Sequence, residues 1–212
     1  MKSNDWKIWQ LADSAFPVGG FAHSGGVEAA WRAGEIDDEP SLLQFLESSL
    51  VQCAHATAPL ALWAFRQPRN LHEADQLCDL LLNHPVSNRA SRAQGKGMLA
   101  AARQVFSVEC SPPIGHFGPV FGNVCHCLNM EEDRTAALFL FLNLRSALSA
   151  AVRLGIVGPM AAQKIQCQLI PIGEKLAETA MQIPPDDVAL TAPVAEILQA
   201  CHDRLYSRLF QT

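Results

Sequence analysis

A long helical stretch with an apolar middle limits most strongly how this chain can fold. Hydrophobic periodicity predicts a helix over residues 131–154, and its middle, residues 136–142, reads AALFLFL. A helix that is apolar all round has no face for water, so we expect a central buried helix covered by other elements. The most apolar window, residues 136–144, closes at Arg145 and is too short to span a bilayer, so no membrane partner is expected.

The remaining periodic segments also predict helices. Apolar residues recur at helical spacing, and glycine or proline marks most boundaries. The predicted segments cover residues 8–15, 24–34, 37–53, 59 onward, 72–83, 87–106, 119–128, 131–154, 159–171, 175–181 and 194–204. The sequence contains no alternating strand pattern and no internal repeat. The predicted fold class is therefore all-α, one domain over residues 1–212, a bundle of roughly eight to ten helices around the central one.

The chain carries little charge for its size. Hydrophobic residues make up 49% and charged residues 17%, whereas an average domain has about 25% charged residues. Such a composition indicates apolar surface that a partner covers. The net charge is −5 and the pI is near 5.8, so no overall field attracts nucleic acid. One predicted helix carries a basic stripe that either docks an acidic partner or faces water: Arg89, Arg92, Lys96 and Arg103.

Cysteine usage indicates a reducing compartment. The seven cysteines are odd in number and lack paired spacing. This pattern favours free thiols in a cytoplasmic protein over a disulfide framework. The first residues contain no apolar run of the kind that a signal peptide needs. We therefore expect a cytoplasmic protein.

The sequence shows no local cluster of residues typical of a metal site or a catalytic site. Cys125 and Cys127 flank His126, but helical residues two apart point about 200° from each other, so both thiolates cannot reach one metal. His23 is the histidine expected to be exposed in a loop, either as a transient ligand or as a hydrogen-bonding group of the loop. We expect no catalytic residue, no metal and no cofactor. One alternative stays open, a small enzyme whose cysteine and histidine meet only in space.

A glycine-rich loop, residues 16–28 (FPVGGFAHSGGVE), connects the first two predicted helices. Pro17 fixes its own φ, while Gly19 and Gly20 permit a positive φ or the close approach of another backbone. Phe21 follows with little near it in sequence to bury it. We expect it to be either a partner anchor or a residue tucked under the next helix.

Two glycines inside a predicted helix need a compensating contact. Gly95 and Gly97 each cost about 1 kcal/mol relative to alanine in a helix interior. The close approach of a neighbouring element or of a partner would offset that cost. This helix and the small-residue segment 147–151 are the candidate contacts of a dimer.

The C-terminal tail, residues 205–212, is apolar where a chain end is normally polar. Its side chains at Leu205, Tyr206, Leu209 and Phe210 need a surface on which to dock. We expect the tail and the glycine-rich loop to be neighbours that form one docking face from the two ends of the chain.

Four segments together resemble the urease accessory protein UreF family. They are residues 10–24 (QLADSAFPVGGFAHS), 87–95 (SNRASRAQG), 151–155 with 158–159 (AVRLG and GP), and 202–210 (HDRLYSRLF). Their order and spacing extend the resemblance over nearly the whole chain. The sequence departs from the family at Gly25, where a larger residue is usual, at Val27 in place of leucine, and at Gln211-Thr212 in place of a final serine.

The resemblance implies an all-α, dimer-forming protein without catalysis of its own. Such a protein joins the accessory protein UreD, also called UreH, and the GTPase UreG to apo-urease, and it regulates GTP-dependent nickel insertion into the carbamylated active site. The resemblance also implies a complex that routes nickel through internal passages, so nickel binding by this chain is expected to be indirect. The residues carried over as partner-binding are Pro17, Gly19, Gly20, Phe21, Ser24, Glu28, Tyr206, Ser207, Arg208, Leu209 and Phe210.

Two hypotheses follow for the C-terminal tail. The first is that the tail packs loosely in the isolated chain and becomes ordered against UreD. The second is that Arg208 makes charge-assisted hydrogen bonds to that partner, so that losing it weakens assembly more than losing a charge at the rim would.

Overall fold

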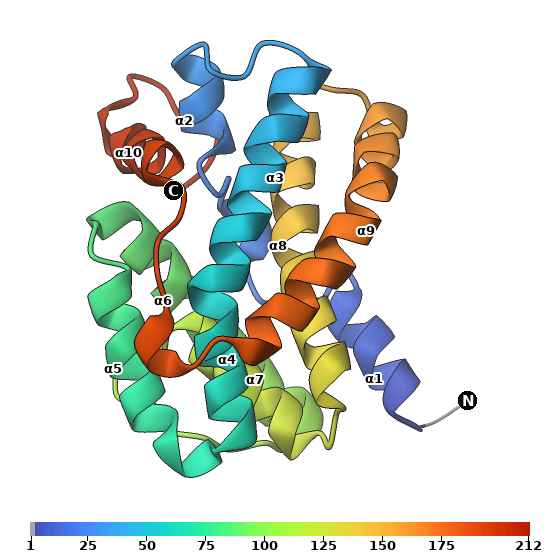
Figure 1. The fold of residues 1–212 in the computed structure, drawn as a ribbon, viewed down its shortest axis with the longest axis vertical. Coiled ribbons are helices and arrows are strands. Elements are labelled where there is room, and N and C mark those ends of the chain that lie inside the picture. Colours follow the sequence, from blue (N-terminus) through green and yellow to red (C-terminus); the bar gives the residue numbers. More distant parts are fainter. Residues whose placement is uncertain (1–2) are drawn as a thin grey trace.

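The computed structural model describes residues 3–212, and over this range the chain forms α-helices and short 3-10 turns without a strand (Figure 1). The predicted all-α class is therefore confirmed. The helices are α1 (Ser3–Ala12), α2 (Val27–Arg32), α3 (Glu39–His55), α4 (Thr57–Arg66), α5 (Leu71–Leu81), α6 (Pro85–Phe106), α7 (Phe117–Cys127), α8 (Glu132–Arg153), α9 (Pro159–Gln182) and α10 (Pro193–Ala200). The 3-10 turns are η1 (Gly20–Ala22), η2 (Pro68–Asn70), η3 (Pro185–Asp187) and η4 (Cys201–Arg204).

Helix boundaries follow the capping and breaking residues of the sequence. α3 begins at a capping box, in which the Asp38 side chain accepts a hydrogen bond from Ser41 N at 2.8 Å. Gly34 and Gly155, with φ of 80° and 75°, follow α2 and α8. The two segments predicted on either side of Pro171 are one helix, because α9 runs through the proline and changes direction along its length (Figure 1).

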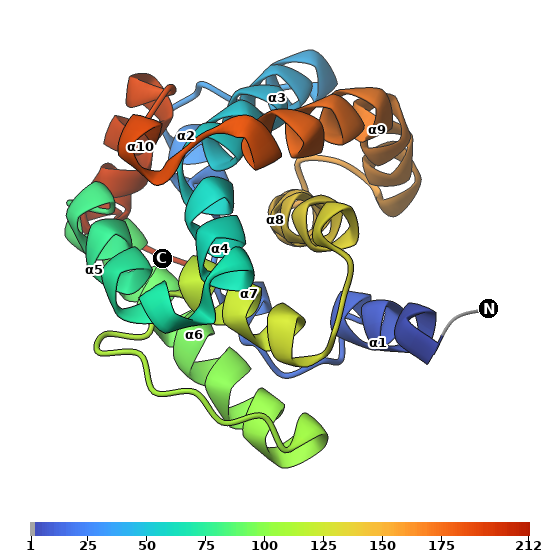
Figure 2. The same cartoon turned by 60° about the horizontal axis from the view of Figure 1, so that its bottom comes forward.

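The predicted central helix is α8. Figure 2 shows it in the middle of the molecule, with α3, α4, α7 and α9 around it. Leu138, Phe139 and Leu140, which point to different sides of the helix, are all buried. Phe139 packs against Phe117 and Phe121 of α7, with ring centroids 5.6 and 5.3 Å apart. The expectation of a central, largely buried helix is therefore met, although Ala137 in its apolar middle is exposed.

Among the described residues, α8 is the one helix that is long and apolar enough to cross a membrane by length and composition. The prediction of an apolar stretch too short to span a bilayer is therefore wrong, because the helix has 22 residues. Burial distinguishes it from a membrane span, since 56% of its most apolar 18-residue window lies inside the protein. A core helix has this property.

Gly95 and Gly97 of α6 are sites of close backbone approach, as the sequence predicts. A Cβ at Gly95 would overlap Gly115 O, and a Cβ at Gly97 would lie 2.8 Å from Val18 O. Only glycine leaves room for such an approach, which offsets its low helix propensity. Both neighbours belong to this chain. Gly95 makes room for the loop before α7, and Gly97 makes room for the glycine-rich loop.

The small residues that made these two segments candidate dimer contacts are already packed within the chain. The glycine face of α6 is occupied by loops of the same chain. The segment 147–151 is occupied as well, because Ala147, Ala150 and Ala151 are buried in the core. Neither the glycine face of α6 nor these three alanines are free for a second copy.

The loop between α6 and α7 is held by one buried carboxylate. Asp75 of α5 accepts hydrogen bonds from the backbone N–H groups of Ile114, Gly115 and His116, at 2.7 to 2.8 Å. Three donors replace the water that this buried carboxylate loses. The loop is thereby fixed where Gly115 meets Gly95.

Candidate partner-binding face

The glycine-rich loop passes over α6 and α8 on its way from α1 to α2. Gly19, Gly25 and Gly26 have φ of 75°, 62° and 90°, in the left-handed region that favours glycine. These angles let the loop turn into η1 while it stays close to both helices. Ser146 of α8 donates a hydrogen bond to Gly20 O at 3.0 Å, which fixes the loop from below.

The C-terminal tail lies beside this loop, as predicted (Figure 1). Ser24 N donates to Thr212 O at 2.7 Å, and Gln211 N donates to Ala22 O at 2.9 Å. These bonds pair the backbone of the loop with the backbone of the tail. The hypothesis that the tail packs loosely in the isolated chain is therefore wrong for this structure.

His23 belongs to the same contact. Its Nδ1 lies 2.5 Å from Thr212 Oγ1, and its side chain is buried. Burial, with a smaller contribution from His202 nearby, lowers the pKa of His23. The expectation of an exposed histidine is wrong. His23 is a hydrogen-bonding group of the loop, as the alternative has it, but its partner Thr212 lies in the tail.

Glu28 of α2 is a fully buried carboxylate that holds the tail. Its Oε1 accepts from Leu209 N at 2.7 Å, and its Oε2 accepts from Phe210 N at 3.1 Å. His202 Nε2 lies 3.0 Å from Oε2. Burial by itself raises the pKa of Glu28, but the hydrogen bonds from Leu209, His202 and Phe210 bring the pKa below its ordinary value. The carboxylate therefore stays ionised while the tail is bound.

Large side chains of the loop and the tail remain exposed around this buried contact. Phe21 is 67% exposed and Leu209 is 53% exposed, while Tyr206 is fully exposed. The expectation that Phe21 tucks under the next helix is therefore wrong. We call the exposed surface formed by Phe21, Arg153, Tyr206, Arg208 and Leu209 the loop–tail face.

Arg153, the last residue of α8, joins the two parts of the loop–tail face. Its guanidinium carbon lies over the ring of Phe21 at 4.6 Å and over the ring of Phe210 at 4.4 Å from the ring centroids. Sequence reasoning did not identify it, although it stands in the segment 151–155 that carries the resemblance. Nothing in the local pattern indicates which rings it meets, because Phe21 and Phe210 come from opposite ends of the chain.

The residues predicted to bind a partner divide into an exposed set and a buried set. Pro17, Gly19, Phe21, Tyr206, Ser207, Arg208 and Leu209 are exposed, and Gly20 is half-buried. Ser24, Glu28 and Phe210 are buried in the contact between loop and tail. Arg208 Nη1 lies 3.2 Å from Asp203 Oδ1, so its charge already has a partner within the chain.

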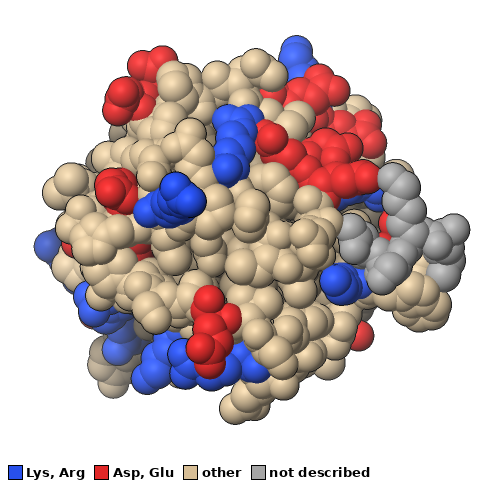
Figure 3. Space-filling model, turned by 90° about the horizontal axis from the view of Figure 1, so that it is seen from below, with Lys and Arg blue, Asp and Glu red and all other residues tan. Residues whose placement is uncertain are grey.

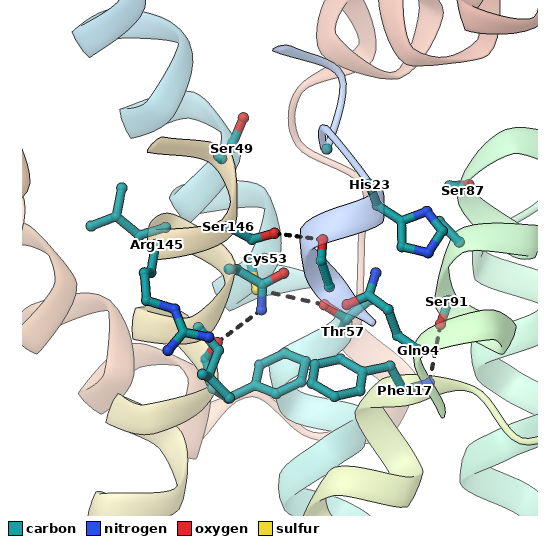
Figure 4. A pocket seen from close by; sticks show the side chains of 18 of the residues that line it. His23, Ser49, Cys53, Thr57, Ser87, Ser91, Gln94, Phe117, Arg145 and Ser146 are labelled. Atoms are coloured by element: carbon teal, nitrogen blue, oxygen red, sulfur yellow. Dashed lines mark hydrogen bonds between the residues drawn. The ribbon is translucent and has the colours of Figure 1, made fainter. Parts of the chain in front are cut away.

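A cavity of about 680 Å³ lies behind the glycine-rich loop. Figure 4 shows part of its wall, including Ser49 of α3, Gln94 of α6, and Arg145 and Ser146 of α8. The lining also includes His23, Cys53 and Glu196, so the wall mixes hydroxyl, amide and charged groups. Residues 3–212 contain no group of three or more His, Cys, Asp or Glu side chains able to hold a metal ion.

Five of the seven cysteines have a thiol pKa above its ordinary value. Cys125 is buried and Cys127 is exposed, so the two point to different surroundings, as the helical spacing predicts. Burial raises the pKa of Cys53 to about 12 and that of Cys110 to about 11. It also raises the pKa of Cys78, Cys125 and Cys127. A raised pKa keeps these thiols protonated, which disfavours nucleophilic catalysis.

Charged side chains gather in separate areas of the surface. In the view from below, Lys and Arg side chains and Asp and Glu side chains form distinct groups, and most of this face is uncharged (Figure 3). Within the basic stripe of α6, Arg89 Nη2 pairs with Asp203 Oδ1 at 2.8 Å. The stripe is thus partly neutralised by η4, which weakens the case for nucleic acid as a partner.

Comparison with known proteins shows which family this chain matches. A family model described as UreF matches residues 36–170. A protein named Urease accessory protein F from Arabidopsis thaliana is 34% identical over 219 residues, which cover 97% of this chain and 91% of that protein. A protein of the same name from Oryza sativa subsp. indica is 32% identical over 221 residues, covering 98% and 85%. Urease accessory protein UreF from Trichodesmium erythraeum is 27% identical over 229 residues, covering 98% and 97%.

The fold defines an all-α class of protein, and these matches define the family within that class. The chain belongs to the UreF family of urease accessory proteins. The resemblance carried by the four sequence segments is confirmed. The matched residues 36–170 lie outside the glycine-rich loop and the tail, whereas the relatives align over nearly the whole chain.

Proposed function

We propose that this chain is an adaptor in urease maturation. It joins the accessory protein UreD (UreH) and the GTPase UreG to apo-urease and regulates GTP-dependent nickel insertion into the carbamylated active site. Membership of the UreF family and the names of the relatives support a role in urease maturation. The finer assignment to UreD and UreG extends the family resemblance to this chain.

The observation that carries the proposal is the loop–tail face. Segments from the two ends of the chain meet there, held by Glu28 and by the bonds of Ser24 and Gln211. Phenylalanine, tyrosine and arginine, which this exposed surface contains, are residue types enriched in protein–protein interfaces. We assign this face to UreD. Ser24, Glu28 and Phe210 then act indirectly, by holding the exposed residues in place.

Nickel is cargo in this proposal, and the chain is not its resident binding site. The lining of the cavity behind the glycine-rich loop includes His23, Cys53 and Glu196, but among residues 3–212 no three such side chains are grouped closely enough to hold a metal ion. An adaptor of this kind works in the cytoplasm and as a homodimer within the larger complex. The dimer contact lies on a surface other than the two that the core already occupies.

Co-expression of the chain with UreD and UreG tests the proposal directly. We expect a tagged chain to retain UreD and UreG in a pull-down, and urease to gain activity in cells only when the chain is present with nickel. Omitting the chain is the control. Unchanged urease activation without it, or no retention of UreD, would contradict the proposal.

The rival class, a small enzyme that uses cysteine and histidine, predicts a hyper-reactive thiol. The raised pKa values of Cys53, Cys110 and Cys127 argue against such a thiol. Profiling thiol reactivity across all seven cysteines tests this point. One cysteine that reacts far faster than a free thiol at neutral pH would favour the enzyme.

A further inference from the structure

Arg153 is held in one position on the loop–tail face. Its guanidinium lies over the rings of both Phe21 and Phe210, and its Nη1 donates a hydrogen bond to Phe21 O at 2.5 Å. An unrestrained arginine loses side-chain freedom when it binds a partner. Arg153 has already lost much of that freedom in the free chain, so it is preorganised for a further contact.

The guanidinium also has unused binding capacity. Arg153 is exposed, and it donates one hydrogen bond although a guanidinium carries five N–H donors. It has no carboxylate partner among residues 3–212. By contrast, Arg89 and Arg208 both pair with Asp203, at 2.8 and 3.2 Å. The arginine that bridges loop and tail therefore remains free to bind an acid from outside.

We propose that Arg153 is a recognition residue of the loop–tail face and that it binds a carboxylate of the partner, an Asp or Glu side chain flanked by apolar atoms. The exposed ring of Phe21 offers those apolar atoms a surface beside the guanidinium. The rings shield part of the guanidinium from water, which strengthens its attraction for a carboxylate. The inference rests on the proposed function, since it takes UreD as the protein that meets this face.

Two substitutions separate the charge of Arg153 from its packing. Arg153→Met keeps a long side chain over the two aromatic rings but removes the charge and the donors. Arg153→Lys keeps the charge but loses the planar guanidinium, which can donate two parallel hydrogen bonds to one carboxylate. Arg69→Gln is the matched control, because Arg69 is an exposed arginine in η2, away from the loop–tail face.

The measurement is the affinity of the full-length chain for purified UreD at low and high salt. We expect Arg153→Met to weaken binding by about 10- to 100-fold, the effect of losing hydrogen bonds to a charged group. Arg153→Lys is expected to fall between Arg153→Met and wild type, and Arg69→Gln to match wild type. The salt dependence of binding should decrease in Arg153→Met, because one ion pair is lost.

Amide hydrogen exchange distinguishes recognition from a merely structural role. We expect the amides of Ser24 and Gln211 in Arg153→Met to stay within about twofold of wild-type protection. Loss of affinity with intact protection supports the proposal. Loss of affinity with a parallel loss of protection would overturn it, because Arg153 would then act only by holding loop and tail together.

Two further outcomes are decisive. Wild-type affinity in Arg153→Met would overturn the inference while leaving the proposed function in place. Absence of UreD binding by the wild-type chain would overturn the proposed function and the inference with it. Recovery of binding when Arg153→Glu is combined with an acid-to-lysine substitution in UreD would identify the carboxylate directly.

Discussion

Glu28 shows how a single residue positions a surface without being part of it. The carboxylate is fully buried and accepts hydrogen bonds from two backbone N–H groups of the tail. Such bonds compensate for the lost hydration of the charge, and they exist only while the tail is docked. The resemblance assigned Glu28 to partner binding. Its place in the structure indicates that it serves the partner by holding Leu209 and Phe210.

Replacing Glu28 by glutamine tests that role. In Glu28→Gln the amide NH₂ group faces a backbone N–H group or the His202 imidazole in place of an acceptor oxygen. We expect a loss of about 1–3 kcal/mol in the free energy of unfolding and faster exchange of the Leu209 and Phe210 amides. Glu35→Gln, at an exposed acid, is the control. Equal stability and exchange in the two variants would contradict the assignment.

The loop–tail contact is expected to weaken on acidification in two stages. His23 has a folded pKa below its ordinary 6.5, so protonation favours release of the loop as the pH falls below about that value. Glu28 has a folded pKa below its ordinary 4.5, so its contribution is complete above that value and is lost as the pH falls through the lowered pKa. His202 faces both groups.

Stability measured against pH checks this expectation. We expect stability to fall below pH 6.5 and to fall further below pH 4.5. His23→Asn should remove the first stage, and Glu28→Gln should remove the second. A wild-type curve that stays flat between about pH 7 and about pH 4 would show that neither group is linked to folding.

Exposed side chains of the tail are expected to affect binding without affecting folding. Leu209 and Tyr206 are exposed, so truncation leaves no cavity in the core. We predict that Leu209→Ala and Tyr206→Ala each reduce UreD affinity by about 1–2 kcal/mol or more, with the unfolding midpoint unchanged. Leu80→Ala, at an exposed leucine of α5, is the control for a general loss of surface leucine. An unchanged UreD affinity in both tail variants would remove them from the interface.

At the scale of elements, α6 is the support on which two loops rest. Gly95 receives the loop before α7, and Gly97 receives the glycine-rich loop. At each glycine, a backbone carbonyl oxygen of the neighbouring loop lies too close to leave room for a Cβ atom. The helix therefore couples the position of the loop–tail face to the packing of α7.

Alanine substitutions distinguish these two contacts. Gly97→Ala must displace Val18 O, which lies 2.8 Å from the position of the added Cβ. We expect a loss of about 1–3 kcal/mol in stability and weaker UreD binding as the glycine-rich loop shifts. Gly95→Ala should cost more, because the loop that it would move is fixed by Asp75. Thermal and chemical unfolding, together with the UreD pull-down, measure both effects.

The control for the glycine substitutions lies in another helix. A methyl group added at Gly173 of α9 would meet no atom within 4 Å, so Gly173→Ala is expected to stabilise the protein by up to about 1 kcal/mol. Equal effects of alanine at positions 97 and 173 would show that the close approach of Val18 has no energetic consequence.

At the scale of the whole molecule, the two ends of the chain close into one surface above a core built around α8. Phe210 of the tail packs in the core. The backbone of the tail forms hydrogen bonds with the loop, from Gln211 N to Ala22 O and from Ser24 N to Thr212 O. The central helices do not depend on the tail for their own packing, because α8 is covered mainly by α3, α4, α7 and α9. Removing the tail should therefore affect the loop–tail face more than the fold.

Deletion of residues 205–212 tests this division. We expect UreD binding to be lost and the helical circular dichroism signal to be retained, with lower stability because Glu28 loses two hydrogen-bond donors and Phe210 no longer packs in the core. Binding of UreD at wild-type strength by the shortened chain would contradict the assignment of the tail to the interface. Loss of the helical signal would show that the tail supports the whole fold.

The adjacency of loop and tail was expected from the apolar side chains at both ends of the chain together with the family resemblance. Local patterns in the amino-acid sequence alone were enough to predict the helices, the central position of α8 and the close approach at Gly95 and Gly97. These features depend on periodicity, on backbone freedom and on the need to cover apolar side chains, all of which can be read along the chain. The packing of the helices in three dimensions was needed to establish that Glu28 and His23 are buried, that Phe21 is exposed, and that Arg153 bridges the two ends of the chain. Contacts between residues that are far apart in sequence depend on how the helices pack, and no local pattern encodes which charge meets which ring or backbone group.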